Sequence, residues 1–229
     1  MKLGLQRKGA ALKGVVVGAL VTGALSVGTA WADVTVTVDG SDPYQGFMNV
    51  FELPINGGAF VFGSPWGTAD LTAVFAGNTL TLGPNTIGDP DPFWYIGGGG
   101  PGAAGNKIME ANMYVEQTGP LAGQMVTLVG TVTSNTLTSA HVARAFIRDF
   151  APDFSSAVDA FITLPASGDF TVSLNTINDP ARHVQYGFQM TGVNVWITDV
   201  APYGTVVIDP LSPTPTVDTS WGRLKSLYR

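Results

Sequence analysis

Short runs in which apolar and polar residues alternate dominate this sequence, and this period of two restricts the possible folds more than any other feature. Val34–Val38 and Thr79–Leu82 alternate at every position. Successive side chains of a β-strand point to opposite faces, so such runs indicate strands with one buried face. We expect about eleven to thirteen short strands. Further runs of this kind are Asp70–Phe75, Met125–Val132, Phe170–Leu174, His183–Met190, Val193–Ile197 and Gly204–Ile208.

Turn signals separate these runs. Ala76-Gly77-Asn78 predicts a hairpin turn, because Gly and Asn tolerate positive φ. Thr86–Lys107 is rich in Pro and Gly and predicts a long surface loop. Asp-Pro steps mark further turns or strand ends, since a residue before Pro avoids helical backbone angles. These steps begin at Asp42, Asp89, Asp91, Asp179 and Asp209.

One segment fits two structures. Val142, Phe146 and Phe150 are four residues apart, which suits a helix that begins near Ser139. The same stretch also alternates, and we favour a strand because its neighbours are strands and β-branched residues flank it. Many short strands without helices between them predict an all-β fold, an antiparallel β-sandwich of jelly-roll-like form. In its His183–Met190 strand, Val184, Tyr186, Phe188 and Met190 should face the core, with His183, Gln185 and Gln189 facing out.

Both ends of the chain differ from its middle. Residues 1–32 have a basic start, an apolar run over Gly14–Val27 and the A-x-A site Ala30-Trp31-Ala32, which together predict a signal peptide cleaved after Ala32. The apolar run is shorter than the ~20 residues of a membrane-spanning helix. We therefore expect a secreted or cell-surface protein with no transmembrane span in its mature chain. The sandwich should occupy residues 33–208, followed by a Pro-rich linker over 209–219 and a basic amphipathic segment over 220–229.

The composition limits the chemistry. Asp33–Asp218 contains all 17 acidic residues and four basic ones, a net charge of −13. Such a chain repels phosphate backbones, so we expect no nucleic-acid partner. The absence of cysteine excludes disulfides, thiol nucleophiles and Cys metal ligands.

Four short motifs carry a resemblance to known proteins. The runs Trp66–Leu71, Gly105–Ala111, His183–Phe188 and Gly192–Trp196 resemble a group of uncharacterised exported bacterial β-sandwich proteins, which in turn resemble jelly-roll carbohydrate-binding modules. The resemblance covers roughly Asp39–Ile208. It implies the fold and a carbohydrate as the class of ligand, but it implies no reaction and no binding residues.

No catalytic residue is predicted. The chain has neither a Gly-x-Ser-x-Gly elbow nor a His-Glu-x-x-His pair. We expect its two histidines to be ordinary, with His183 exposed on a polar strand face and His141 in a Ser/Thr-rich turn. The glycines of Gly100–Gly105 have P-loop spacing, but the Lys-Ser/Thr that should follow is missing. Glu110 and Glu116 would lie about 20 Å apart on one strand face, wider than the ~5–10 Å that glycosidases use.

Aromatic rings and acidic turns supply the candidate binding residues. Sugar rings stack on aromatic side chains, so Trp94 and Tyr95 in the long loop and Trp66 in another turn are the candidates for a ligand site. One of Trp94 and Tyr95 should pack inward, which leaves the other free to face solvent, while Trp196 should belong to the core. A structural calcium ion is possible, because hard cations prefer carboxylate and carbonyl oxygens; solvated turns are the alternative. The candidate calcium ligands are Asp39, Asp42, Asp89 and Asp91.

The sequence thus predicts an exported, non-catalytic module that binds carbohydrate or a surface polymer. One alternative is a structural or adhesive surface protein that self-associates, and another is a glycan hydrolase with an unrecognised site. The last segment should act as a docking or sorting tag, or else be a frayed terminus without a role. Its apolar and basic residues are Trp221, Arg223, Leu224, Lys225, Leu227 and Tyr228.

Overall fold

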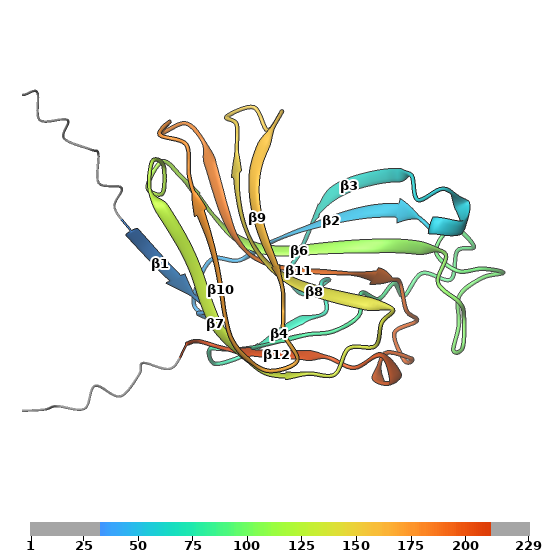
Figure 1. The fold of residues 1–229 in the computed structure, drawn as a ribbon. Helices are drawn as coiled ribbons and strands as arrows, with labels where there is room; N and C mark the ends of the chain where they lie inside the picture. Colours follow the sequence, from blue (N-terminus) through green and yellow to red (C-terminus); the bar gives the residue numbers. More distant parts are fainter. Residues whose placement is uncertain (1–32, 212–229) are drawn as a thin grey trace, which may run out of the picture. The chain divides into compact units, whose positions relative to one another are not determined.

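Two six-stranded sheets pack face to face in the computed structural model, which describes residues 33–211 (Figure 1). Sheet A has the order β10–β7–β12–β5–β4, and β1 pairs with β7 on the same edge as β12. Its strands are β1 (Asp33–Thr37), β4 (Ala73–Ala76), β5 (Thr79–Leu82), β7 (Met125–Asn135), β10 (Gly168–Asn175) and β12 (Val206–Asp209). Sheet B runs β3 (Phe60–Trp66), β2 (Gln45–Glu52), β6 (Lys107–Thr118), β11 (His183–Val193), β8 (His141–Phe150) and β9 (Ala157–Thr163).

The strand order is that of a jelly roll. The four-stranded set β5–β12–β7–β10 faces the set β6–β11–β8–β9, and the chain passes repeatedly from one set to the other. All strand pairs between residues 33 and 211 are antiparallel except β1 with β7. The only helices in this range are two short 3-10 turns, η1 (Pro54–Asn56) and η2 (Ala201–Tyr203). The predicted all-β sandwich is confirmed.

The alternating positions predicted to be apolar fill the space between the sheets. Val184, Tyr186, Phe188 and Met190 of β11 are buried there, as predicted. Leu128 of β7 and Ile208 of β12 pack into the same core from sheet A, among the other residues of the cluster. With no cysteine in the chain, no disulfide contributes to stability, so burial and hydrogen bonding must stabilise the sandwich.

Most of the predicted strands are present, and two differ. Ser139–Phe150 contains strand β8 and no helix, and Gly77 forms the β4–β5 turn with φ of 62°. The strand predicted over Asp70–Phe75 begins only at Ala73, because Asp70–Thr72 form turns whose backbone groups bond to Gly67, Ala73 and Gly83.

The strand predicted over Val193–Ile197 is wrong beyond Val193. Asn194 lies outside strand β11, and its side chain forms hydrogen bonds with the long loop and with the start of β6. Its Oδ1 accepts the N–H of Lys107 (3.0 Å) and its Nδ2 donates to the carbonyl of Trp94 (2.9 Å). These bonds to residues far away in the sequence take the place of the strand pairing that the alternation predicted.

Sheet B is curled, so that its outward face is concave. Gly187 lies in the middle of that sheet, where a Cβ would collide with the backbone of Met113 on β6. The curl has a consequence for β11. Gln185 and Gln189 face away from the core as predicted, yet they are only 5% and 2% exposed. Sheet B therefore has buried polar residues on the face that points away from the core.

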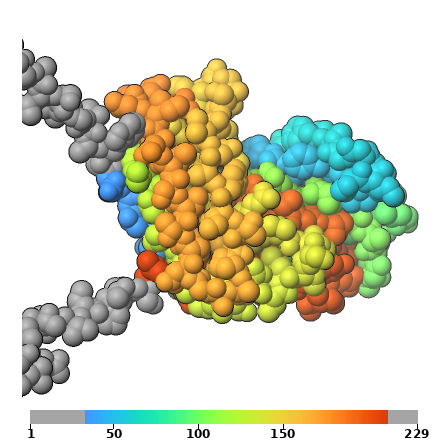
Figure 2. Space-filling model, viewed as in Figure 1, coloured from blue at the N-terminus to red at the C-terminus, as the bar shows by residue number. Residues whose placement is uncertain are grey.

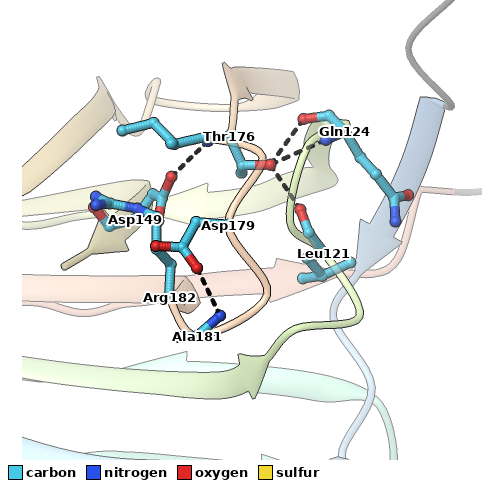
Figure 3. A network of polar contacts seen from close by, with 8 residues as sticks. Leu121, Gln124, Asp149, Thr176, Asp179, Ala181 and Arg182 are labelled. Carbon is cyan, nitrogen blue, oxygen red and sulfur yellow. Dashed lines mark hydrogen bonds and ion pairs between the residues drawn. The ribbon is translucent and has the colours of Figure 1, made fainter. Parts of the chain in front are cut away.

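A polar network stabilises the end of the sandwich at which β8 ends and β11 begins (Figure 3). Asp149 is fully buried on the core face of β8 and accepts bonds from Arg182 and from the N–H of Ile177 (2.7 Å). The hydroxyl of Thr176 lies 2.6 Å from the carbonyl of Leu121 and accepts the N–H of Gln124 at 3.0 Å. The network ties the β6–β7 and β10–β11 loops to the strands that carry the concave face.

Several expectations fall outside the described residues. These are the signal peptide over 1–32, most of the linker over 209–219, and the segment over 220–229 with Trp221, Arg223, Leu224, Lys225, Leu227 and Tyr228. Strand β12 ends at Asp209, one residue beyond the predicted limit of the sandwich. None of the helices between residues 33 and 211 is long and apolar enough to cross a membrane.

Candidate functional site: a groove on the concave sheet

The concave face of sheet B presents side chains in rows that cross neighbouring strands. The pairing registers place one such row in the order Glu116, Gln185, Arg148, Asp159, on β6, β11, β8 and β9. Side chains opposite each other in adjacent strands lie within reach of contact. The row therefore alternates acid, amide, base and acid across four strands.

A groove of about 540 Å³ lies on this face. Figure 2 shows the surface hollowed between the cyan β2–β3 hairpin and the gold and orange region around β9. The volume lies within the range of small-ligand sites, about 300–1,000 Å³. The residues that line it are Gln45, Phe47, Asn49, Pro65, Asn112, Tyr114, Glu116, Arg148, Phe150, Phe154 and Gln185. They come from β2, β3, β6, β8 and β11 and from the β8–β9 loop, so most of them stand on rigid strands.

Arg148 is held by aromatic rings and one carboxylate. Its Nε donates to Oδ1 of Asp159 at 2.8 Å. Its guanidinium carbon lies 5.2, 5.4 and 5.5 Å from the ring centres of Phe146, Phe161 and Phe150. Cation–π attraction at these distances favours a fixed guanidinium orientation.

Glu116 is oriented from two sides. Nε2 of Gln185 donates to its Oε2 at 2.7 Å, and Nδ1 of His183 lies 3.3 Å from its Oε1. The hydroxyl of Thr118 also lies 2.8 Å from Nδ1 of His183. The Glu116 carboxylate is thereby presented to the groove as a hydrogen-bond acceptor in a fixed position.

Hydrogen-bonded amides lie next to this row: Asn49 and Asn112 line the groove, and the buried Gln189 pairs with Asn112. Nε2 of Gln189 donates to Oδ1 of Asn112 at 3.0 Å, and Nδ2 of Asn112 in turn donates to the carbonyl of Glu110 at 3.2 Å. Nδ2 of Asn49 donates to Oε1 of Glu110 at 2.9 Å. The Oε1 atom of Gln189 is buried with no hydrogen-bond partner among the described residues. Such an atom retains an unused capacity to accept a bond.

Tyr114 contributes the only hydroxyl group among the residues that line the groove. Burial raises the pKa of Tyr114, the charge of Glu116 raises it further, and the positive charge of Arg148 opposes both. The phenol is thus neutral at physiological pH and can both donate and accept a hydrogen bond. It lies in the row between Gln45 on β2 and Gly187 on β11.

Phe154 closes one end of the groove from the β8–β9 loop. It is the only non-glycine residue between 33 and 211 with a positive φ, 58°, and its side chain is half exposed. Its ring stacks on the imidazole of His183, with centres 4.3 Å apart and planes 18° apart. A bulky residue in the left-handed region is strained, and such strain gathers at functional sites.

The aromatic residues singled out in the sequence lie elsewhere. Tyr95 is fully buried and is the inward-packing ring of its pair, with its hydroxyl 2.5 Å from the carbonyl of Ile87. Its ring packs edge-to-face on Trp196, which is partly buried against the core. Trp94 is half-buried and packs edge-to-face on Phe93 (4.7 Å).

Trp66 belongs to a different depression. It lines a hollow of about 530 Å³ together with Asp70 and Ile197, and its Nε1 donates to the hydroxyl of Ser64 at 2.9 Å. This hollow shares only Pro65 with the groove. The structure therefore does not bring Trp66, Trp94 and Tyr95 into one site, and none of them lines the groove.

The acidic turns bond to their own backbones. Oδ1 of Asp39 accepts the N–H and the hydroxyl of Ser41, which lowers the pKa of Asp39. Burial, aided by the charge of Asp39, raises the pKa of Asp42. Asp89 accepts the N–H of Asp91, which accepts the N–H of Phe93. Residues 33–211 contain no group of three or more His, Cys, Asp or Glu placed to hold a metal, and calcium binding stays a prediction.

The groove residues were not predicted from the sequence, because they alternate with apolar residues in the way that residues on any exposed strand face do. A signal was nevertheless present. The strand Phe146–Phe150 places two phenylalanines and an arginine on one face, which an ordinary exposed strand does not require.

Comparison with known proteins adds no relative: no family model, no curated protein and no solved structure matches this chain.

Proposed function

We propose that this protein is a non-catalytic module that binds a carbohydrate in the groove of sheet B. The observation that carries the proposal is the combination of aromatic rings with fixed polar groups in one groove of ligand size. Phe47, Phe150 and Phe154 offer faces on which a sugar ring can stack. Between them stand donors and acceptors that match sugar hydroxyl groups.

The fixed geometry of these polar groups supports the proposal. Glu116 is held by Gln185 and His183, so it can accept a hydroxyl hydrogen without first losing side-chain freedom. Asn112 is held in the same way by Gln189 and by the backbone. A polar ligand loses less affinity to ordering when the groups that meet it are already oriented.

Titration of the full chain with a panel of soluble glycans, followed by calorimetry, tests the proposal. Phe154→Ala should weaken binding of the best glycan about tenfold, which corresponds to about 1.4 kcal/mol. Phe60→Ala is the matched control, because Phe60 is also an exposed phenylalanine but lies outside the groove.

Two results would contradict the proposal. One is equal binding by wild type and Phe154→Ala, which would place the ligand elsewhere. The other is the release of new reducing ends from the bound glycan, which would make the protein a hydrolase.

A further inference from the structure

We propose that the groove selects glycans that carry a carboxylate, and that the guanidinium group of Arg148 binds that carboxylate. This inference rests on the proposed function, since it names the class of carbohydrate that the same groove takes. The ligand is a uronic-acid residue set among mainly neutral sugars.

The first observation is an unused fork of hydrogen-bond donors. Arginine carries five N–H donors, and the described residues take up only the one on Nε, which Asp159 accepts. Neither Nη1 nor Nη2 has a partner between residues 33 and 211. The Arg148 side chain is 16% exposed, and its Nη atoms are not among the fully buried polar atoms without a partner, so water reaches them in the free protein. A ligand carboxylate can replace that water with two charge-assisted hydrogen bonds, which are stronger than bonds between neutral groups.

The second observation is that the fork is fixed. Asp159 holds the Nε side, and the guanidinium carbon lies over the rings of Phe146, Phe150 and Phe161. A carboxylate meets a guanidinium group through two parallel N–H···O bonds, whereas a hydroxyl group accepts a single one. An oriented fork therefore distinguishes a uronate from the corresponding neutral sugar.

The charge of the chain limits the number of carboxylates that the ligand can carry. Arg148 is the only cationic residue among those that line the groove. Asp33–Asp218 has a net charge of −13, so a polymer with a charge on every unit would be repelled as a whole. Glu116 is two strands away from Arg148, about 10 Å, and its repulsion of a bound carboxylate is weaker than the attraction of the adjacent guanidinium. One cation therefore suits one carboxylate within a mainly neutral chain.

Matched pairs of glycans test the inference on the wild-type full chain. Each pair consists of a uronate-bearing oligosaccharide, on a xylan, galactan or mannan backbone, and the same oligosaccharide after reduction of its carboxyl groups to alcohols. Calorimetry should show at least about tenfold weaker binding of the reduced form, as expected for the loss of a charge-assisted pair. Equal binding of both members would overturn this inference and leave the proposed function intact. Binding of no glycan in any pair would overturn both.

Two variants locate the effect. Arg148→Lys keeps the charge but removes the fork, and it should lower affinity for the uronate form about tenfold while changing affinity for the reduced form less than twofold. Arg144→Gln is the control, because Arg144 is exposed on the same face of β8 but does not line the groove. It should bind both forms as wild type does. Wild-type preference in Arg148→Lys, or loss of preference in Arg144→Gln, would contradict the assignment of the carboxylate to Arg148. The pair comparison on wild type holds even if a variant fails to fold.

Discussion

Arg182 forms two hydrogen bonds with Asp149. Its Nε donates to the carboxylate Oδ1 at 2.8 Å, and its Nη2 donates to the backbone carbonyl of the same residue at 2.8 Å. Asp149 is fully buried, and its neighbours on β8, Arg148 and Phe150, point into the groove. The pair therefore joins the loop before β11 to the back of the strand that carries the candidate ligand contacts.

Removing one charge of this pair should strongly destabilise the sandwich. Asp149→Asn leaves Arg182 as a buried, uncompensated charge, and the free energy of unfolding should fall by about 3–5 kcal/mol in urea denaturation. Asp179→Asn is the matched control in the same network, because an amide oxygen can still accept the N–H of Ala181. Equal stability of the two variants would show that the Arg182–Asp149 pair is not structurally important.

Tyr95 should act as a core residue and not as a ligand contact. Tyr95→Phe removes the hydroxyl that lies against the carbonyls of Ile87 and Val195, and should cost about 1–3 kcal/mol of stability. Tyr95→Ala should cost about 3–5 kcal/mol. Trp94→Ala should leave glycan affinity within twofold of wild type, since Trp94 does not line the groove. Thermal unfolding and calorimetry check these outcomes, and a large loss of affinity in Trp94→Ala would return the ligand site to the loop.

The curl of sheet B should depend on Gly187. Gly187→Ala places a Cβ against the backbone of Met113, and overpacking of this kind costs about 1–3 kcal/mol. Because the ladder must open to admit the methyl group, glycan affinity should fall as well. Gly88→Ala is the control, since a Cβ there meets nothing within 4 Å. A Gly187→Ala protein with wild-type melting temperature and affinity would contradict the dependence of the curl on this glycine.

Acid should weaken the fold through His141. Burial lowers the pKa of His141 from its ordinary value of 6.5, and the hydrogen bond to the carbonyl of Val193 opposes this shift only in part. Because that carbonyl accepts from Nε2, a second proton would go to Nδ1, which has no partner among the described residues. The unfolded chain therefore binds the proton more readily, so the stability from neutral His141 is complete above pH 6.5 and is lost as the pH falls below it.

The comparison of wild type with His141→Gln isolates this effect. The stability difference between the two proteins should shrink by at most about 2 kcal/mol between pH 8 and pH 5, as measured by chemical denaturation. A difference that is independent of pH would show that His141 does not titrate differently in the folded and unfolded chain.

Local patterns were enough to predict most of the strands and the fold class. The alternation in His183–Met190 predicted both the strand and its core face, and the strand interpretation of Ser139–Phe150 is confirmed. The alternation failed where a side chain bonded to a distant loop, as at Asn194, because such a bond depends on residues far away in the sequence.

The groove could not be predicted in the same way. Alternation tells which residues leave the core but not whether their face is flat or curled. Gln185 and Gln189 were predicted to face out, and they do, but they are buried on the concave side of sheet B. Trp66, Trp94 and Tyr95 were chosen as candidates because aromatic residues often bind sugars. The groove residues come together only through the pairing of β2, β6, β8 and β11, and no local sequence pattern contains the register of that pairing.

The pairing of strand β7 has a consequence for the order of folding. Along one of its edges β1 pairs with Met125–Val129 and β12 with Thr131–Asn135, so the first and last strands of the sandwich lie end to end on the same partner. Strand β12 also joins β7 to β5, so sheet A stays in two pieces until the last strand arrives. Pairings of such long sequence separation are slow to form. The sandwich can thus close only after the chain has been completed through Asp209, and a partly made chain would still expose the edges of β5 and β7.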